Sequence, residues 1–208
     1  MTHTLHRQGT TESLRRDYVL LCMAAKGLNE DEADEKMREF LRIVIKHKAI
    51  NFGDMRTGNS FSCSAEDIIP KVTSTSIVHG VFTDRDTVVE VIKSLKEADL
   101  GMSVVVSGPF SSLDEAFGEA GVQPHSADFS GGVWGKTERL PRREVMEVTT
   151  MCGHAMISAN LVEETAKRIG AGAISAKEGS LELGKVCCCG IYNQIRAEKL
   201  LKKMADQK

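Results

Sequence analysis

A short, unbroken run of apolar residues near the N-terminus limits the folds open to this chain more than any other feature. The run YVLLCMAA, residues 18–25, follows a charged residue and is followed by Lys26-Gly27. A continuous apolar run of this length is typical of a buried β-strand, and it is too short to span a bilayer as a helix. We therefore predict a sheet with this segment in its core.

The next hundred residues alternate between helix patterns and further apolar runs. Apolar residues at helical spacing predict helices over about 30–47 and 84–98, and we expect a capping box at the start of the second from Thr83 and Asp86. The runs SIVHGVF and SVVVSG predict two more strands of the same sheet. We expect NFGDMRTGNSFSC to be a loop, and HSADFSGGVWG to be either a fourth strand or an extended glycine loop.

The pattern changes near Leu140, after which the segments PRREVMEVTT, HAMISANLVEETAKRIG, SAKEGSLELG and NQIRAEKLLKKMA all predict helices. The predicted fold is therefore α/β, with a small β-α sheet layer over about residues 1–135 and a C-terminal helical layer over about 140–208. We expect one domain, 1–208, made of a β-α portion (1–138) and a helical, cysteine-rich portion (139–208).

Composition narrows the classes of partner. The formal net charge is −2, and aromatic residues make up 5% of the 208 residues; neither value favours phosphate contacts or base stacking, so we expect no nucleic-acid partner. The polar start MTHTLHRQGTTESLRR is unlike a secretory signal, and we expect a cytoplasmic protein with no membrane partner. Thiols stay reduced in that compartment, so the six cysteines are expected to be ligands, catalysts or buried apolar residues.

Four of the six cysteines gather in two short segments. TTMCGHAMISANL contains Cys152 and His154, and KVCCCGIYN contains Cys187, Cys188 and Cys189. We expect Thr149 or Thr150 to cap a helix that begins near Cys152, where the helix dipole would favour a thiolate. Asn193 is the expected cap of the helix that follows the second segment.

If the two segments converge, four thiols and one imidazole share a pocket, and a metal ion is the simplest neutraliser of their charge. Soft thiolates suit zinc, Cu(I) or an iron–sulfur cluster. Because side chains alternate along an extended chain, we expect Cys187 and Cys189 to face one ion together with Cys152. Cys188 would face away, and it is a further candidate ligand. The alternative is four small residues packed at a helix junction.

The stretch MCGHA, with Cys152, Gly153 and His154, resembles the local motif of cofactor-independent racemases and isomerases of the proline racemase and PhzF-like group. In that group a second thiol followed by glycine faces the first, and the matching residues here are Cys189 and Gly190. The resemblance implies proton transfer by Cys152 and Cys189. It covers about ten residues, and the members of that group are longer proteins made of two similar halves.

Three functions follow as hypotheses. The first is an enzyme that uses an iron–sulfur cluster or thiolate-bound metal on a small anionic substrate. The second is metal-free cysteine catalysis by Cys152, His154 and Cys189, and the third is a non-catalytic metal-binding or redox-sensing module. We expect a small-molecule substrate, and the sequence is compatible with a homo-oligomer.

The remaining cysteines and histidines each have two interpretations. Cys22 is expected in the core, and Cys63 is either a fourth ligand or a loop residue. The pair His3 and His6 is either a metal or proton-exchange site or part of a frayed polar terminus. His79 lies within a predicted strand and is expected to be a core residue with its hydrogen bonds satisfied. His125 begins a loop or strand and is a candidate pocket-lining residue.

Overall fold

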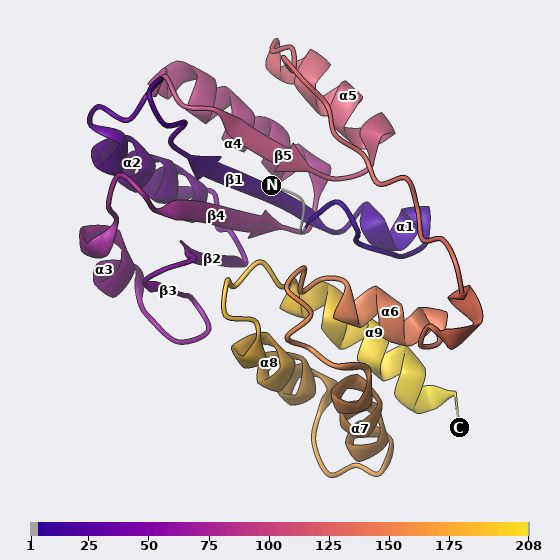
Figure 1. The fold of residues 1–208 in the computed structure, drawn as a ribbon. Coiled ribbons are helices and arrows are strands. Elements are labelled where there is room, and N and C mark those ends of the chain that lie inside the picture. The colour runs from indigo at the N-terminus through magenta and orange to yellow at the C-terminus, as the bar shows by residue number, and fades with distance from the viewer. Residues whose placement is uncertain (1–3, 208) are drawn as a thin grey trace.

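A computed structural model describes residues 4–207 (Figure 1). The strands are β1 (Tyr18–Met23), β2 (Asn51–Asp54), β3 (Gly58–Asn59), β4 (Ile77–Phe82) and β5 (Val104–Ser107). The α-helices are α1 (Thr11–Leu14), α2 (Ala33–Lys46), α3 (Ala65–Ile68), α4 (Arg85–Ala98), α5 (Phe110–Ala120), α6 (Arg143–Thr149), α7 (Ala159–Gly170), α8 (Ala176–Val186) and α9 (Gln194–Asp206). Two 3₁₀ turns, η1 (Ile69–Lys71) and η2 (Thr137–Arg139), complete the regular elements of this part of the chain.

The strands form one sheet in the order β3-β2-β4-β1-β5, and every neighbouring pair is antiparallel. Strands β1 and β2 run in the same direction with β4 between them, and β4 and β5 run in the same direction with β1 between them. The chain therefore forms two interleaved β-α-β units, β1-α2-β2 and β4-α4-β5, which is the split β-α-β topology of ferredoxin-like folds. A shared topology carries no function with it.

Strand β1 is buried on both faces of the sheet, which explains its unbroken apolar sequence. Tyr18, Leu20 and Cys22 pack into one core, whereas Val19 and Leu21 pack into a second core on the opposite face. All five are 0–1% exposed. A strand with one solvated face would alternate polar and apolar residues instead.

Helices α2 and α4 cover the first face. Each presents one apolar stripe to the sheet, as its spacing predicts, and the expected helices and strands of this half are confirmed. The start of α4 differs in detail from the expectation. Its N-cap is Asp84, whose carboxylate accepts a hydrogen bond of 2.8 Å from the backbone N–H of Thr87; the predicted capping box from Thr83 and Asp86 is wrong.

The C-terminal helices α6 to α9 form a layer against the second face of the sheet (Figure 1). Their apolar residues share one core with Val19, Leu21 and Val81 of the two central strands. The predicted α/β fold with a C-terminal helical layer is therefore confirmed. The three buried cysteines of this half, Cys152, Cys187 and Cys189, belong to the same core.

Two segments test the loop predictions. The segment 51–63 contains the hairpin β2-β3, so the prediction of a loop throughout is wrong. Its buried polar residues can occupy strand positions because they have hydrogen-bond partners. The carboxylate of Asp54, for example, accepts hydrogen bonds from the side chain of Ser76 and from the backbone N–H of Ile77. Residues 121–136 contain no regular element, which agrees with the extended-loop alternative, and they run along one side of the molecule from α5 towards α6 (Figure 1).

Within residues 4–207, no helix combines the length and the apolar character needed to cross a membrane.

Candidate functional site

Cys152 lies in a loop between two helices, not at a helix start. Helix α6 ends at Thr149, and α7 begins only at Ala159, where the side chain of Ser158 caps it by accepting a hydrogen bond from the backbone N–H of Leu161. The prediction of a helix beginning near Cys152 is therefore wrong. Ala155 interrupts any helix here, because its φ of 55° places it in the left-handed region.

The segment Cys187–Gly190 is a tight turn between α8 and α9. The backbone N–H of Gly190 donates to the carbonyl of Cys187 over 3.0 Å, and Gly190 has a φ of +73°. Within the turn, Cys187 and Cys189 are buried whereas Cys188 is exposed, so the expected alternation is confirmed. Asn193 caps α9 as predicted, by accepting a hydrogen bond of 2.9 Å from the N–H of Arg196.

The thiols of the two segments converge. The Sγ atoms of Cys187 and Cys189 lie 3.7 Å apart, and the Cys187 thiol also interacts with Cys152. Each of the three is no more than 2% exposed. The structure thus confirms that these sulfurs meet, and it places Cys187 between the two residues that resemble the racemase pair.

Hydrogen bonds favour the thiolate at both outer positions. The S–H of Cys187 and then the backbone N–H groups of Met156, Ile157 and His154 lower the pKa of Cys152. The pKa of Cys189 is lowered by Cys187, by the N–H of Ile191 and by the side chain of His154. The pKa of Cys187 is raised, because its proton is held by these two neighbours and because it is buried.

Cys187 has only one S–H, so it can stabilise one thiolate at a time. The three thiols therefore titrate as a coupled group, and their first proton leaves well below the ordinary thiol pKa while the second leaves at higher pH. The expected thiolate at Cys152 is thus supported, but its cause is a set of loop amides and a neighbouring thiol. No helix begins at Cys152, so the expected position at a helix start is not the source of this shift.

A thin surface loop separates this cluster from solvent. Residues 153–156, which include His154, are exposed, and Cys152 lies buried at their base. The imidazole of His154 hydrogen-bonds Cys189, so one exposed, ionisable side chain reaches the buried thiols.

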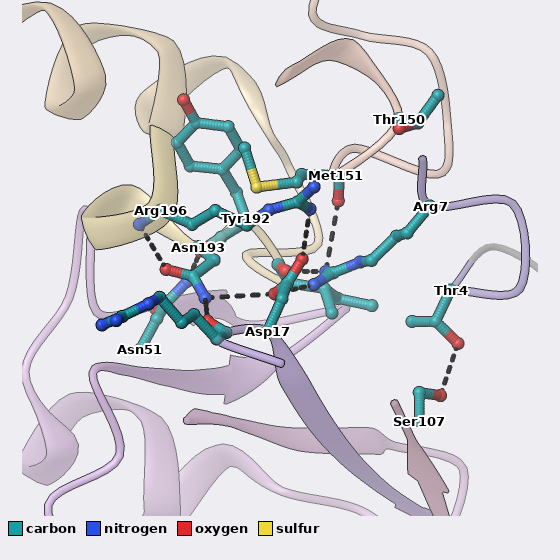
Figure 2. A network of polar contacts seen from close by, with 12 residues as sticks. Thr4, Arg7, Asp17, Asn51, Ser107, Thr150, Met151, Tyr192, Asn193 and Arg196 are labelled. Atoms are coloured by element: carbon teal, nitrogen blue, oxygen red, sulfur yellow. Dashed lines mark hydrogen bonds and ion pairs between the residues drawn. The ribbon is translucent and has the colours of Figure 1, made fainter. Parts of the chain in front are cut away.

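The sheet and the N-terminal segment support the turn, and none of the residues involved was predicted. Asn51 donates its side-chain amide to the carbonyl of Gly190, and Asn59 donates to that of Cys188 over 3.3 Å. Arg7 donates to the carbonyls of Met151 and Ile191 (Figure 2). The sequence offers one signal for Asn51 and Asn59: two side-chain amides occur close together in a short segment that contains glycine.

Tyr192 completes the apolar wall around the thiols. Its ring packs against Phe61 with centroids 6.2 Å apart, and it shares a core with the three cysteines. The side chain is fully buried, and its hydroxyl has no hydrogen-bond partner among the described residues. Burial, together with the charges of Cys187 and Cys152, raises its pKa.

The other candidates lie apart from this cluster or do not extend it. Cys188 is exposed. Cys22 lies in the core on the opposite face of the sheet, where burial raises its pKa to about 12, so its predicted packing role is confirmed. Cys63 is partly exposed and contacts Ser62 Oγ at 3.6 Å.

Of the histidines, His3 lies outside the described residues. His6 is exposed and hydrogen-bonds Ser130 Oγ at 3.2 Å. His79 is fully buried in β4. His125 is exposed and hydrogen-bonds Ser103 and Ser126.

The arrangement of donors does not form a ready metal centre. In the part of the chain that the structure describes, no group of three or more His, Cys, Asp or Glu side chains is placed to hold a metal ion. Instead, the Cys187 thiol contacts those of Cys152 and Cys189 directly.

Comparison with known proteins adds no further information: no protein-family model, no curated protein and no solved structure matches this chain.

Proposed function

We propose that this protein is a thiol redox protein in which Cys187 and Cys189 form a disulfide when a small peroxide reaches the cluster. The observation that carries the proposal is the 3.7 Å separation of their Sγ atoms. A disulfide needs about 2.05 Å, so a small rotation of two side chains within one turn closes the bond. Both roles, as a redox enzyme and as a redox sensor, use this step.

The protonation state of each thiol determines its role, because the pKa of Cys189 is lowered and that of Cys187 is raised. The Cys189 thiolate attacks one oxygen of hydrogen peroxide, an S–O bond forms as the O–O bond breaks, and the second oxygen takes up a proton and leaves as water. Cys187 then loses its proton and attacks the sulfenic sulfur, so that an S–S bond forms and a second water leaves. The two thiols lose two hydrogens, and the peroxide is reduced.

The same geometry argues against two-base proton transfer of the racemase type. That chemistry needs a substrate carbon between the two thiols. Here Cys187 fills the space between Cys152 and Cys189, because it interacts with both. Two surface hollows lie away from the thiols, one between α2 and α4 and one beside α5.

A second candidate is a soft metal ion or an iron–sulfur cluster acting on a small anion. The observation in its favour is electrostatic. Cys152 and Cys189 both favour the thiolate in a buried setting, and a cation bound by thiolates would neutralise that charge. Side chains would have to move before three of them converge on one ion.

The deciding experiment starts with protein purified without oxygen. Metal content is measured first, and the protein is then treated with hydrogen peroxide, alkylated and digested. Trypsin releases Val186–Arg196 as one peptide, because Lys185 and Arg196 provide the cleavage sites. We expect a metal-free protein in which this peptide carries a Cys187–Cys189 disulfide and an alkylated Cys188.

Two serine variants make the assignment specific. Cys189→Ser should abolish the disulfide, whereas the matched variant Cys188→Ser, one residue away and exposed, should keep it. Stoichiometric metal that protects the thiols would favour the second candidate instead, and peroxide treatment that leaves all three turn thiols alkylatable would overturn the redox proposal. The proposal places the protein in the cytoplasm, where a disulfide would be reduced again after each oxidation.

A further inference from the structure

The N-terminal segment 4–10 touches both loops that carry the buried thiols. Arg7 is its central residue, with a side chain only 6% exposed. Its guanidinium donates to the carbonyls of Met151 and Ile191 and pairs with the carboxylate of Asp17. Figure 2 shows Arg7 reaching across this junction, with Asp17 beside it.

The two carbonyls bound by Arg7 flank the thiols in sequence. Met151 directly precedes Cys152, and Ile191 follows Cys189 and Gly190. A planar guanidinium offers several N–H donors in a fixed geometry, so one side chain fixes the distance between the two loops.

The residues next to Arg7 repeat the attachment. The backbone N–H of Gln8 donates to Thr150 Oγ1 over 3.0 Å, and the carbonyl of Gln8 accepts a hydrogen bond of 2.6 Å from Arg196. Further back, Thr4 Oγ1 hydrogen-bonds Ser107 Oγ on β5 at 2.8 Å. The segment thus connects the sheet to the thiol loop and to α9.

This attachment can be released without dismantling the fold. Residues 4–10 form no regular secondary structure, so separate hydrogen bonds rather than strand pairing attach them to the rest of the protein. Asp17 would keep a partner if Arg7 left, because Arg196 Nη1 donates to its other oxygen over 2.7 Å. Segments held in this way open at lower free energy than the core does.

We propose that Arg7 is a positioning residue that holds the Cys152 loop against the Cys187–Gly190 turn, and that release of segment 4–10 exposes the buried thiols to reagents. The inference rests on the proposed function only in taking these thiols as the reactive groups. It assigns to the N-terminal segment the control of how fast an oxidant reaches them.

The test is the alkylation rate of each cysteine in the full chain, measured with iodoacetamide and peptide mass spectrometry. Arg7→Met should speed alkylation of Cys152 and Cys189 by about tenfold or more, since it removes buried hydrogen bonds from a charged donor. Cys22 should stay protected, because only global unfolding exposes it. Arg15→Met, which changes an exposed arginine in the same region, should leave every rate unchanged.

Two milder variants separate positioning from a general loss of stability. Arg7→Lys keeps the positive charge but has one nitrogen in place of the two that Arg7 divides between Asp17 and the two carbonyls, so we expect an intermediate acceleration and a shifted pH profile at Cys152. Thr150→Val removes the bond from Gln8 and should accelerate Cys152 more than Cys189. If Arg7→Met also exposes Cys22, these two variants decide.

The inference would be overturned if Cys152 and Cys189 were alkylated at the same rate in the folded Arg7 variants as in the unmodified protein. Alkylation requires no oxidation, so this result is independent of the peroxide experiment. A protein that forms no disulfide but gains thiol reactivity in Arg7→Met would refute the redox proposal and keep the positioning role. A protein that forms the disulfide but shows unchanged alkylation rates in Arg7→Met would keep the redox proposal and refute the positioning role.

Discussion

Asn59 occupies the space that a side chain at position 190 would need. A Cβ built on Gly190 would lie 2.4 Å from Asn59 Cβ and 2.5 Å from its Cγ. The sheet therefore touches the backbone of the thiol-bearing turn directly, and only glycine permits this approach. The positive φ of Gly190 is a second reason for glycine at the same position.

Gly190→Ala should destabilise the protein through both effects. Gly172→Ala is the matched control, because Gly172 has a similar φ of +71° but no atom within 4 Å of the position that a Cβ would take. We expect the control to lose about 1–2 kcal/mol from left-handed strain alone, and Gly190→Ala to lose a further 1–3 kcal/mol, roughly, from the clash. Urea unfolding measures both, and equal losses would show that Asn59 moves away freely.

Asp17→Asn should be among the most damaging single changes outside the two apolar cores. The Asp17 carboxylate is fully buried and pairs with Arg7 and Arg196, so its neutralisation leaves buried positive charge. We expect a loss of about 3–5 kcal/mol in the free energy of unfolding. Asp34→Asn, which removes the exposed partner of Arg38, should cost about 0.5 kcal/mol or less; similar losses in the two variants would contradict the network.

Tyr192→Phe should leave stability unchanged or raise it slightly. The hydroxyl is buried without a partner among the described residues. Burying an unsatisfied polar group costs about 1–3 kcal/mol of desolvation free energy, and we expect the variant to regain part of that cost. The thermal midpoint of the two proteins decides. A clear drop in the variant would mean that an ordered water molecule satisfies the hydroxyl.

The pH dependence of alkylation should reveal the first proton of the cluster. The pKa of Cys152 is lowered to about 5, first by Cys187 and then by three loop amides, so its relative alkylation rate should hold at neutral pH and fall as the pH drops through about 5. A free cysteine loses its reactivity near pH 8.5. A midpoint there would contradict the amide and thiol contacts.

The sign of the accompanying stability change follows from the same shift. A lowered native pKa adds stability that is fully present above the ordinary thiol pKa and is lost as the pH falls through the native value. The thermal midpoint should therefore decline as the pH is lowered from the ordinary thiol pKa towards the native pKa of about 5. Cys152→Ala should flatten the decline.

The sequence was most informative where one element carries its own pattern. The apolar run of β1 and the stripes of α2 and α4 need only local spacing, and all three were predicted. The convergence of Cys152 with Cys187 and Cys189 was also predicted, because two unusual segments were assumed to share one purpose. The start of α7 was predicted wrongly, since Ser158 rather than Thr149 or Thr150 caps it.

The parts that were missed depend on contacts between distant residues. Arg7 and Ile191 are 184 positions apart, and a polar N-terminus gives no local sign that one of its arginines is buried. Strand β2 was missed because Asn51 and Asp54 resemble loop residues until their hydrogen-bond partners are known.

The double burial of β1 has a consequence for the order in which the chain can fold during synthesis. Val19 and Leu21 leave the ribosome before the residues that cover them, which belong mostly to α6 through α9. Until then the nascent sheet presents a bare apolar face, the kind of surface that aggregates or recruits chaperones. We therefore expect the two portions to fold together rather than as independent units, with β1 fully enclosed only after α6 to α9 have packed against it.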